Sequence, residues 1–160
     1  VLPHGLMIPG LNDSKKLTER AREKLFAVIT GAALSYGIAY ATVEEIDTLN
    51  ILNAAQLAMR RAVEMLDPPP DLVLVDGNIA RDFPVPAVAI VGGDSSCVSI
   101  AAASVLAKVA RDRYCAELDA LYPGYGFALH KGYPTKAHYM AIEQLGAIDG
   151  VHRMSFKLYR

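Results

Sequence analysis

Two aspartates occupy positions where a chain of alternating helices and strands could bind a metal ion. Asp76 directly follows the apolar run Leu72–Val75, and Asp94 follows the apolar run Val85–Val91 after two glycines. Both runs are short, nearly continuous and bounded by turn residues, which is typical of strands buried on both faces. Because ligands gather beyond the carboxyl ends of parallel strands, neighbouring strands would bring both carboxylates into one cleft.

Two carboxylates in one cleft favour a hard divalent cation. They repel each other and raise each other's pKa, and a bound cation removes that cost. Carboxylate oxygens suit Mg²⁺ or Mn²⁺. The same residues also allow a purely structural interpretation, because Asp76-Gly77-Asn78 resembles a turn and Asp94 could be the N-cap of a following helix. The two aspartates alone leave both interpretations open.

Two other segments have the composition of phosphate or nucleic-acid contacts. Residues 12–16 precede a predicted helix, where lysines and backbone amides can hold a phosphate. Residues 122–135 mix aromatic residues with Gly, His and Lys, so that aromatic faces could stack on a base or sugar while cations meet phosphate. A solvated loop and a packing cap, respectively, are the structural alternatives. The candidate contacts are Lys15, Lys16, His130, Lys131 and Tyr133.

Helices that alternate with the two buried runs predict an α/β fold. Helices are expected over about 18–30 (ended by Gly31), 50–66, 98–121 and from 134 or 135 to 145, with one more starting after Thr42. A further strand is expected over 33–42. This strand count is low for a self-sufficient sheet, and Val1-Leu2-Pro3 looks like the tail of a strand. We therefore expect upstream sequence to be missing.

The composition indicates one folded domain and excludes a disordered chain. The 160 residues are 52% hydrophobic and 21% charged, and the net charge of -1 gives no overall support for a nucleic-acid binder. The part from His130 onward is nevertheless locally basic, through Lys131, Lys136, Arg153, Lys157 and Arg160. No apolar run is long enough to span a membrane. The two cysteines lack metal-motif spacing, which favours buried thiols in a reducing cytoplasm.

Six segments, in order along nearly the whole chain, together resemble the ribonuclease HII family. They are Gly10–Leu17, Glu45–Asn53, Val73–Asn78, Gly93-Asp94 with Ser99–Lys108, Tyr125–Thr135, and His152-Arg153 with Ser155-Phe156. Six blocks in the right order are far more specific than one short motif. The resemblance implies an RNase H-like mixed sheet flanked by helices, in a single domain over residues 1–160 that lacks its first strand.

The resemblance also implies a metal-dependent endonuclease that cuts the RNA strand of RNA–DNA hybrids, including ribonucleotides embedded in DNA, and leaves a 3′-hydroxyl and a 5′-phosphate. The family places four carboxylates on two divalent metals, here Mn²⁺ or Mg²⁺, and Asp76 and Asp94 match two of them. The other two form an Asp-Glu pair in an Asp-Glu-x-Gly-Arg-Gly motif, which this sequence does not contain and which would lie upstream of Val1.

The same resemblance assigns the substrate contacts. Tyr133 matches the aromatic residue that packs on the sugar at an RNA–DNA junction, and the segments with Lys15, Lys16, His130 and Lys131 would meet the phosphate backbone. We expect a cytoplasmic monomer that is inactive and loosely folded when the chain is made alone. Two alternatives remain: a nucleic-acid-binding remnant that has lost cleavage, and an unrelated metal-dependent phosphoester hydrolase.

Overall fold

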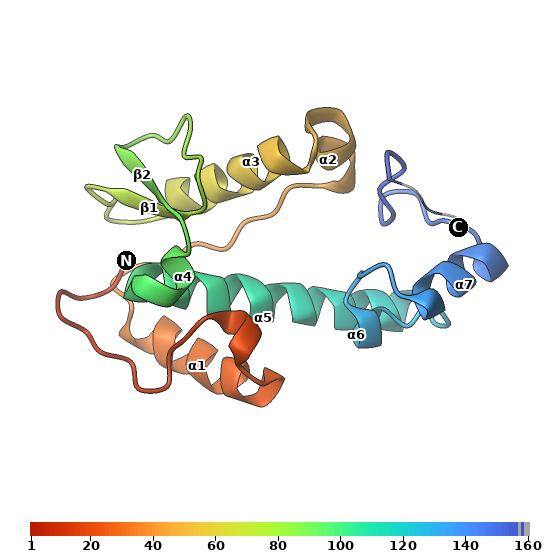
Figure 1. Cartoon of the computed structure of the whole chain (residues 1–160), viewed down its shortest axis with the longest axis horizontal. Helices are drawn as coiled ribbons and strands as arrows, with labels where there is room; N and C mark the ends of the chain where they lie inside the picture. The colour runs from red at the N-terminus through yellow and green to blue at the C-terminus, as the bar shows by residue number, and fades with distance from the viewer. Residues whose placement is uncertain (157, 159–160) are drawn as a thin grey trace. The chain divides into compact units, whose positions relative to one another are not determined.

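The computed structural model describes residues 1–156 and 158, and its internal contacts divide the chain into two compact units (Figure 1). Unit 1 comprises Val1–Tyr40 and Gln56–Val109, and unit 2 comprises Ala41–Ala55 with the described residues from Ala110 onward. Two long helices contribute residues to both units. The expected single domain over residues 1–160 stays a prediction.

Unit 1 contains the two predicted buried strands, which confirms the α/β class. They are β1 (Val73–Asp76) and β2 (Ala87–Ile90), and they pair in parallel with Asp76 opposite Ile90. Burial on both faces was predicted for these strands and is not seen: Val75 is buried, whereas Val88 is 48% exposed and Asp76 is exposed. Among the described residues the strands form only this parallel pair.

The strand predicted over 33–42 is wrong, and Val1-Leu2-Pro3 is not a strand either. The two segments exchange two backbone hydrogen bonds, from the Leu34 nitrogen to the Val1 oxygen at 2.9 Å and from the Val1 nitrogen to the Ser35 oxygen at 2.7 Å. Side-chain bonds hold the rest of the segment instead. The Arg61 guanidinium donates to the Tyr40 oxygen at 3.0 Å, so this segment is extended without belonging to a ladder.

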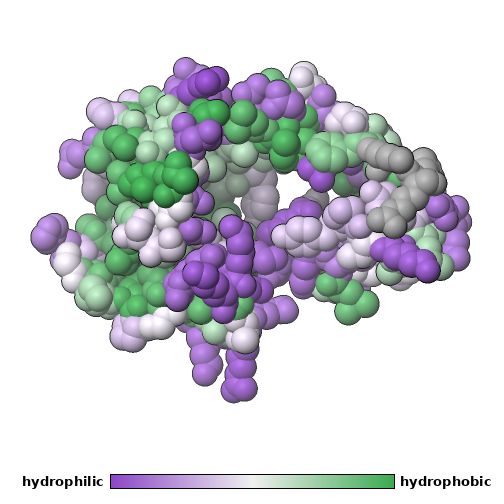
Figure 2. Space-filling model, viewed as in Figure 1, coloured by the Kyte–Doolittle hydropathy of each residue, from purple (hydrophilic) through white to green (hydrophobic). Residues whose placement is uncertain are grey.

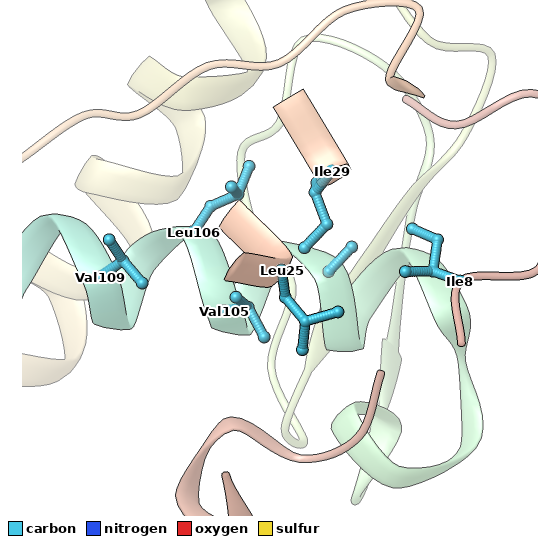
Figure 3. Close-up of a cluster of buried hydrophobic side chains, with 7 residues drawn as sticks. Ile8, Leu25, Ile29, Val105, Leu106 and Val109 are labelled. Carbon is cyan, nitrogen blue, oxygen red and sulfur yellow. The ribbon is translucent and has the colours of Figure 1, made fainter. Parts of the chain in front are cut away.

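The core of unit 1 lies between the helices α1 (Glu19–Ala32) and α5 (Val98–Leu121). Thr18 caps α1 as predicted, but the helix continues through Gly31 and ends at Ala32. Figure 3 shows side chains of α1 and α5 pointing toward one another, and Ile8 of the N-terminal segment lies beside them. The buried set consists of Ile8, Leu25, Ile29, Ala102, Val105, Leu106 and Val109.

Two short elements and most of one long helix complete unit 1. The 3-10 turn η1 (Ser14–Lys16) precedes α1, and the four-residue helix α4 (Gly93–Ser96) follows β2. Most of α3 (Ile51–Glu64) also belongs here and confirms the helix predicted over 50–66, although it ends two residues early.

Hydrophobic side chains also lie at the surface of unit 1 near its small sheet. Figure 2 shows hydrophobic residues exposed around β1 and β2. Leu72 and Val88 are each 48% exposed, and Val91 is 81% exposed. An apolar surface beside a two-stranded sheet is a site for association with other apolar groups. Across residues 1–156 and 158, no helix is long and apolar enough to cross a membrane.

Unit 2 is built from three short helices and the second half of α5. The helix α2 (Val43–Leu49) begins with a capping box between Thr42 and Glu45, and α7 (Lys136–Leu145) begins after Thr135 as predicted. The one-turn helix α6 (Phe127–His130) lies between α5 and α7 in sequence. The core of unit 2 consists of Leu118, Tyr125, Phe127 and Ala141, against which Tyr122, Ile148 and Val151 pack.

Candidate active site

Asp76 and Asp94 lie at the same rim of the unit 1 sheet. Asp76 is the last residue of β1, and its Oδ1 accepts a hydrogen bond from the Gly93 nitrogen at 2.9 Å. Gly93 begins α4, and Asp94 is the next residue. Asp94 therefore lies in the first turn of α4 and not at the N-cap of the long helix. The expected convergence of the two strand ends is present in the structure.

Two glycines allow the chain to turn sharply between β2 and α4. Gly92 has a φ of 67°, which L side chains rarely adopt. Gly93 is buried, and a Cβ there would lie 2.5 Å from Cδ1 of Ile100. A side chain at position 93 would therefore require the Ile100 side chain to shift.

Lys15 provides a positive charge at this rim. Its Nζ lies 3.8 Å from Oδ2 of Asp94, and its side chain is 80% exposed while that of Asp94 is 13% exposed. Water screens an ion pair with so exposed a partner, so the pair is weak and readily exchanged. Asp76 is exposed, so a cation from solution can reach its carboxylate, whereas the Asp94 side chain is largely covered.

The turn that carries Lys15 is held by residues of two helices. The Ser14 hydroxyl lies 2.7 Å from the hydroxyl of Ser104 on α5. The Arg22 guanidinium on α1 donates to the Ser14 oxygen at 3.1 Å and to the Leu17 oxygen at 2.6 Å. Lys16 lies in the same turn and is exposed. The role of Arg22 was not predicted from the sequence. The available signal was a basic residue on the inner side of a helix.

Gln56 fixes the loop that joins β1 to β2. This role of Gln56 was also not predicted from the sequence. This side chain is buried, and its Nε2 donates to the Ile79 oxygen at 3.2 Å while its Oε1 accepts from the Arg81 nitrogen at 3.2 Å. A polar residue within the apolar stripe of a helix was the available signal. These two hydrogen bonds anchor the segment after Asp76 to helix α3.

Tyr133 and Lys131 lie close together in unit 2, in the loop between α6 and α7. The Tyr133 side chain is 64% exposed, and its backbone nitrogen donates to the His130 oxygen at 2.8 Å. Lys131 has a φ of 52°, and its carbonyl oxygen accepts from the Arg111 guanidinium at 3.4 Å. An exposed aromatic ring on a hydrogen-bonded loop is suited to stacking on a nucleotide.

His130 lies in the interior of unit 2. One ring nitrogen, Nε2, lies 2.8 Å from the Tyr125 oxygen, and the other, Nδ1, accepts from the Gly132 nitrogen at 3.1 Å. With both nitrogens engaged, the ring offers no donor to a phosphate in this structure. The predicted phosphate contact of His130 is therefore not favoured, and we treat it as a structural residue.

The C-terminal segment of unit 2 is tied to α2. The carboxylate of Asp47 accepts from the Met154 nitrogen at 2.8 Å and from the hydroxyl and nitrogen of Ser155. The Ser155 hydroxyl is the largest cause that holds the pKa of Asp47 below its usual value. Two basic residues of this segment, Lys157 and Arg160, lie outside the described residues.

The two aspartates suit a hard divalent cation in type but supply only part of a ligand set. Carboxylate oxygens are the donors that Mg²⁺ and Mn²⁺ prefer. Among the described residues, however, no group of three or more His, Cys, Asp or Glu side chains is arranged to hold a metal ion. Asp76, Asp94 and Lys15 come together in unit 1, and Tyr133, Lys131 and His130 come together in unit 2.

A model of the family described as Ribonuclease HII matches residues 5–159 of the chain. The chain belongs to the ribonuclease HII family. Its curated relatives carry the same name. The enzyme from Laribacter hongkongensis is 58% identical over 151 residues, which are 93% of this chain and 76% of the relative. The enzyme from Shewanella amazonensis is 56% identical, over 96% of this chain and 74% of the relative.

Solved structures show the same fold for this ribonuclease HII family member. The crystal structure of the ribonuclease H2 from Pyrococcus horikoshii OT3 matches with a TM-score of 0.73 at 24% identity, over 93% of this chain and 78% of that one. This likeness confirms the RNase H-like fold that the resemblance implied, although the described residues form a parallel pair of strands and not the expected mixed sheet. The family is one of endoribonucleases, which are hydrolases that act on the RNA of RNA–DNA hybrids.

Proposed function

We propose that this chain carries the metal-binding rim and the nucleic-acid contacts of an endonuclease that cuts the RNA strand of RNA–DNA hybrids. The proposed substrates include ribonucleotides embedded in DNA, and the products have a 3′-hydroxyl and a 5′-phosphate. Family membership supports the substrate class. The observation that carries the proposal is the contact between Asp76 and the Gly93 nitrogen, which sets two carboxylates at one accessible rim.

In this proposal Asp76 and Asp94 each hold a divalent cation, Mn²⁺ or Mg²⁺. When bound, such a cation activates a water molecule and stabilises the leaving oxygen of an in-line displacement. Lys15 balances the charge of Asp94 in the free protein, and it is exposed enough to swing to a phosphate of the substrate. Lys16 and Lys131 add to the attraction for the phosphate backbone. Tyr133 packs on the sugar at the RNA–DNA junction.

A second candidate is a nucleic-acid-binding remnant that has lost cleavage. The incomplete ligand set among the described residues favours it. The resemblance implies a further Asp-Glu pair on a first strand, and we propose that the 160-residue chain alone does not cleave. Its two cysteine thiols, one of them fully buried, fit the proposed cytoplasmic location, and we propose that the protein acts as a monomer.

One experiment tests the proposed function and separates the two candidates. A DNA duplex with a single embedded ribonucleotide is incubated in Mn²⁺ or Mg²⁺ with the chain, or with a version extended by any in-frame coding sequence that precedes it in the gene. An all-DNA duplex is the control. Cleavage at the ribonucleotide by the extended protein supports the nuclease. Binding without cleavage by both proteins favours the remnant. If the proteins neither bind nor cleave the duplex, both candidates are ruled out.

A further inference from the structure

Three buried histidines form a stacked cluster in unit 2 that the proposed reaction does not use. His130, His138 and His152 are 8%, 8% and 5% exposed. The rings of His130 and His138 stack with their centroids 4.0 Å apart, and Nε2 of His138 lies 3.2 Å from Nε2 of His152. Phe127 packs edge-on against His130 and His138. Such a cluster can be buried only if each nitrogen has a partner.

The partners at the two ends of the His138–His152 pair determine where the protons lie. The Tyr133 carbonyl oxygen can only accept, so Nδ1 of His138, at 3.1 Å, must carry a proton and donate it. The Ile148 nitrogen can only donate, so Nδ1 of His152, at 2.9 Å, must accept. The proton of a neutral His152 then lies on Nε2 and is donated to Nε2 of His138.

The result is a chain of three hydrogen bonds that all point the same way, from the Ile148 nitrogen through His152 and His138 to the Tyr133 oxygen. We call this hydrogen-bond chain the His152–His138 relay. Each ring is neutral, and each of its nitrogens has one partner. The Tyr133 oxygen also accepts from the Thr135 nitrogen at 2.8 Å. On the other side of Tyr133, the Gly132 nitrogen is bound by His130. The backbone around Tyr133 is therefore fixed on both sides by histidine side chains.

We propose that the His152–His138 relay is a positioning device that holds the backbone of Tyr133 so that its exposed side chain is presented to the nucleic acid. The nature of what Tyr133 contacts rests on the proposed function, but the relay itself does not. His138 and His152 do not touch substrate in this proposal. They act through Tyr133.

The relay works only while both rings are neutral. A protonated His138 would carry a proton on Nε2 that faces the proton on Nε2 of His152, and the hydrogen bond between them would be lost. Burial lowers the pKa of both residues, and the nearby His130 opposes a charge on either ring. The ring of Tyr125 lies 5.6 Å from the ring of His152, measured between centroids. Phe127 is uncharged and packs against all three histidine rings.

The relay is tested first by ¹⁵N NMR of the histidine side chains in the 160-residue chain, above the ordinary histidine pKa of about 6.5. We expect the proton of His138 on Nδ1 and the protons of His130 and His152 on Nε2. A proton on Nε2 of His138 would overturn the proposal. This measurement needs no substrate, so it stands whether or not the chain binds a hybrid.

Two substitutions of His138 separate positioning from plain stability. His138→Asn keeps an N–H near the place of Nδ1, whereas His138→Leu keeps bulk and removes the donor. Both leave the His152 donor without its acceptor, so both should lower the melting temperature. The Tyr133 amide and ring resonances should move in His138→Leu and stay near their wild-type positions in His138→Asn. Equal shifts of the Tyr133 resonances in both variants, or no shift in His138→Leu, would overturn the proposal. His4→Asn, at an exposed histidine, is the control.

Binding gives the functional readout. The affinity for a duplex with an RNA–DNA junction should fall about 10-fold in His138→Leu, the order expected when an aromatic stack is lost. In His138→Asn it should stay close to the wild-type value. Equal affinity of His138→Leu and wild type would overturn the positioning role. A wild-type chain that binds no hybrid contradicts the proposed function, and the NMR results then still decide whether the relay exists.

Discussion

The Oδ1 atom of Asp76 lies 2.9 Å from the backbone nitrogen of Gly93, which joins the end of β1 to the start of α4. The bond uses one oxygen of the carboxylate as a structural acceptor. It does not require a charge, because a neutral amide oxygen also accepts from an N–H, although more weakly. The structural role and the proposed ligand role of Asp76 can therefore be separated by substitution.

Asp76→Asn tests this separation. We predict that cleavage of a ribonucleotide-containing duplex falls by about 100-fold or more in the upstream-extended protein, because a neutral amide is a poor ligand for a hard cation. The melting temperature and the affinity for the duplex should change little. Activity is measured in Mn²⁺ and Mg²⁺, with Asp71→Asn as the control at an exposed neighbouring aspartate. Near-full cleavage by Asp76→Asn would remove Asp76 from the ligand set.

Gly93→Ala should destabilise the protein by about 1–3 kcal/mol, because the new Cβ overpacks against Ile100. Ile100→Val removes the atom that the Cβ would meet at 2.5 Å, so the double variant should be more stable than the sum of the two single changes predicts. Chemical denaturation measures all three. Gly31→Ala is the control, since nothing lies near that position inside α1 and the change should stabilise by about 0.5–1 kcal/mol. Additive effects at Gly93 and Ile100 would contradict the clash.

Lys15→Ala should leave stability almost unchanged, because the ion pair with Asp94 has a largely exposed partner and such pairs contribute about 0–1 kcal/mol. Hybrid binding should weaken, and the slope of log affinity against log salt should become shallower by about one unit if Lys15 neutralises one phosphate. Titrations at several salt concentrations measure the slope. Lys24→Ala, on the exposed surface of α1, should leave it unchanged.

Acid should destabilise unit 2 through its buried histidines. Burial lowers the pKa of His138 and His152 in the folded state, so below about pH 6.5 the unfolded chain binds more protons than the folded one. The stability that they contribute is fully present above that pH and is lost as pH falls through their folded pKa values. Unfolding free energies measured from pH 8 to 5 should show this loss.

The double variant His138→Leu/His152→Leu should show a flatter dependence over the same pH range, and His4→Asn should keep the wild-type dependence. A separate loss is expected at lower pH from Asp47, whose pKa is held below the ordinary value of 3.8 by Ser155. An unchanged pH profile in the double histidine variant would show that the cluster does not control acid stability.

Tyr133→Ala should weaken binding to an RNA–DNA junction by about 1–3 kcal/mol without a comparable change in stability, because the ring is 64% exposed. Affinities for junction-containing and all-DNA duplexes measure the selectivity. Tyr36→Ala removes another exposed tyrosine, 47% exposed, and should leave junction binding unchanged. An equal loss for both kinds of duplex would count against contact with the ribose.

The sequence predicted the elements whose signals are local. Asp76 could be placed at a strand end because the preceding run is apolar and bounded by turn residues, and α5 was predicted with its observed limits because Pro123-Gly124 follow it. The mixture of Gly, Pro and aromatic residues in 122–135 indicated the loop that carries Tyr133. These features depend on residues that are neighbours in the chain.

The features that could not be predicted depend on contacts between distant segments. Residues 33–42 have strand-like composition, yet Arg61 and Asp67 bind this segment through side chains and backbone in place of a ladder. Gln56 looks like a polar interruption until its two backbone partners are known. His130 looks like a phosphate ligand until Tyr125 and Gly132 are seen to occupy its nitrogens.

The loop between β1 and β2 contains no helix, and α4 follows β2 directly in the element order. Asp76 at the end of β1 and Asp94 in α4 therefore belong to one short, continuous stretch of the chain. Closing so short a loop costs little chain entropy, and contacts between residues close in sequence form quickly. The proposed ion-binding edge should therefore assemble early as the protein folds. Amide hydrogens of β1 and β2 should then gain protection from exchange before those that depend on the pairing of Val1 with Leu34 and Ser35.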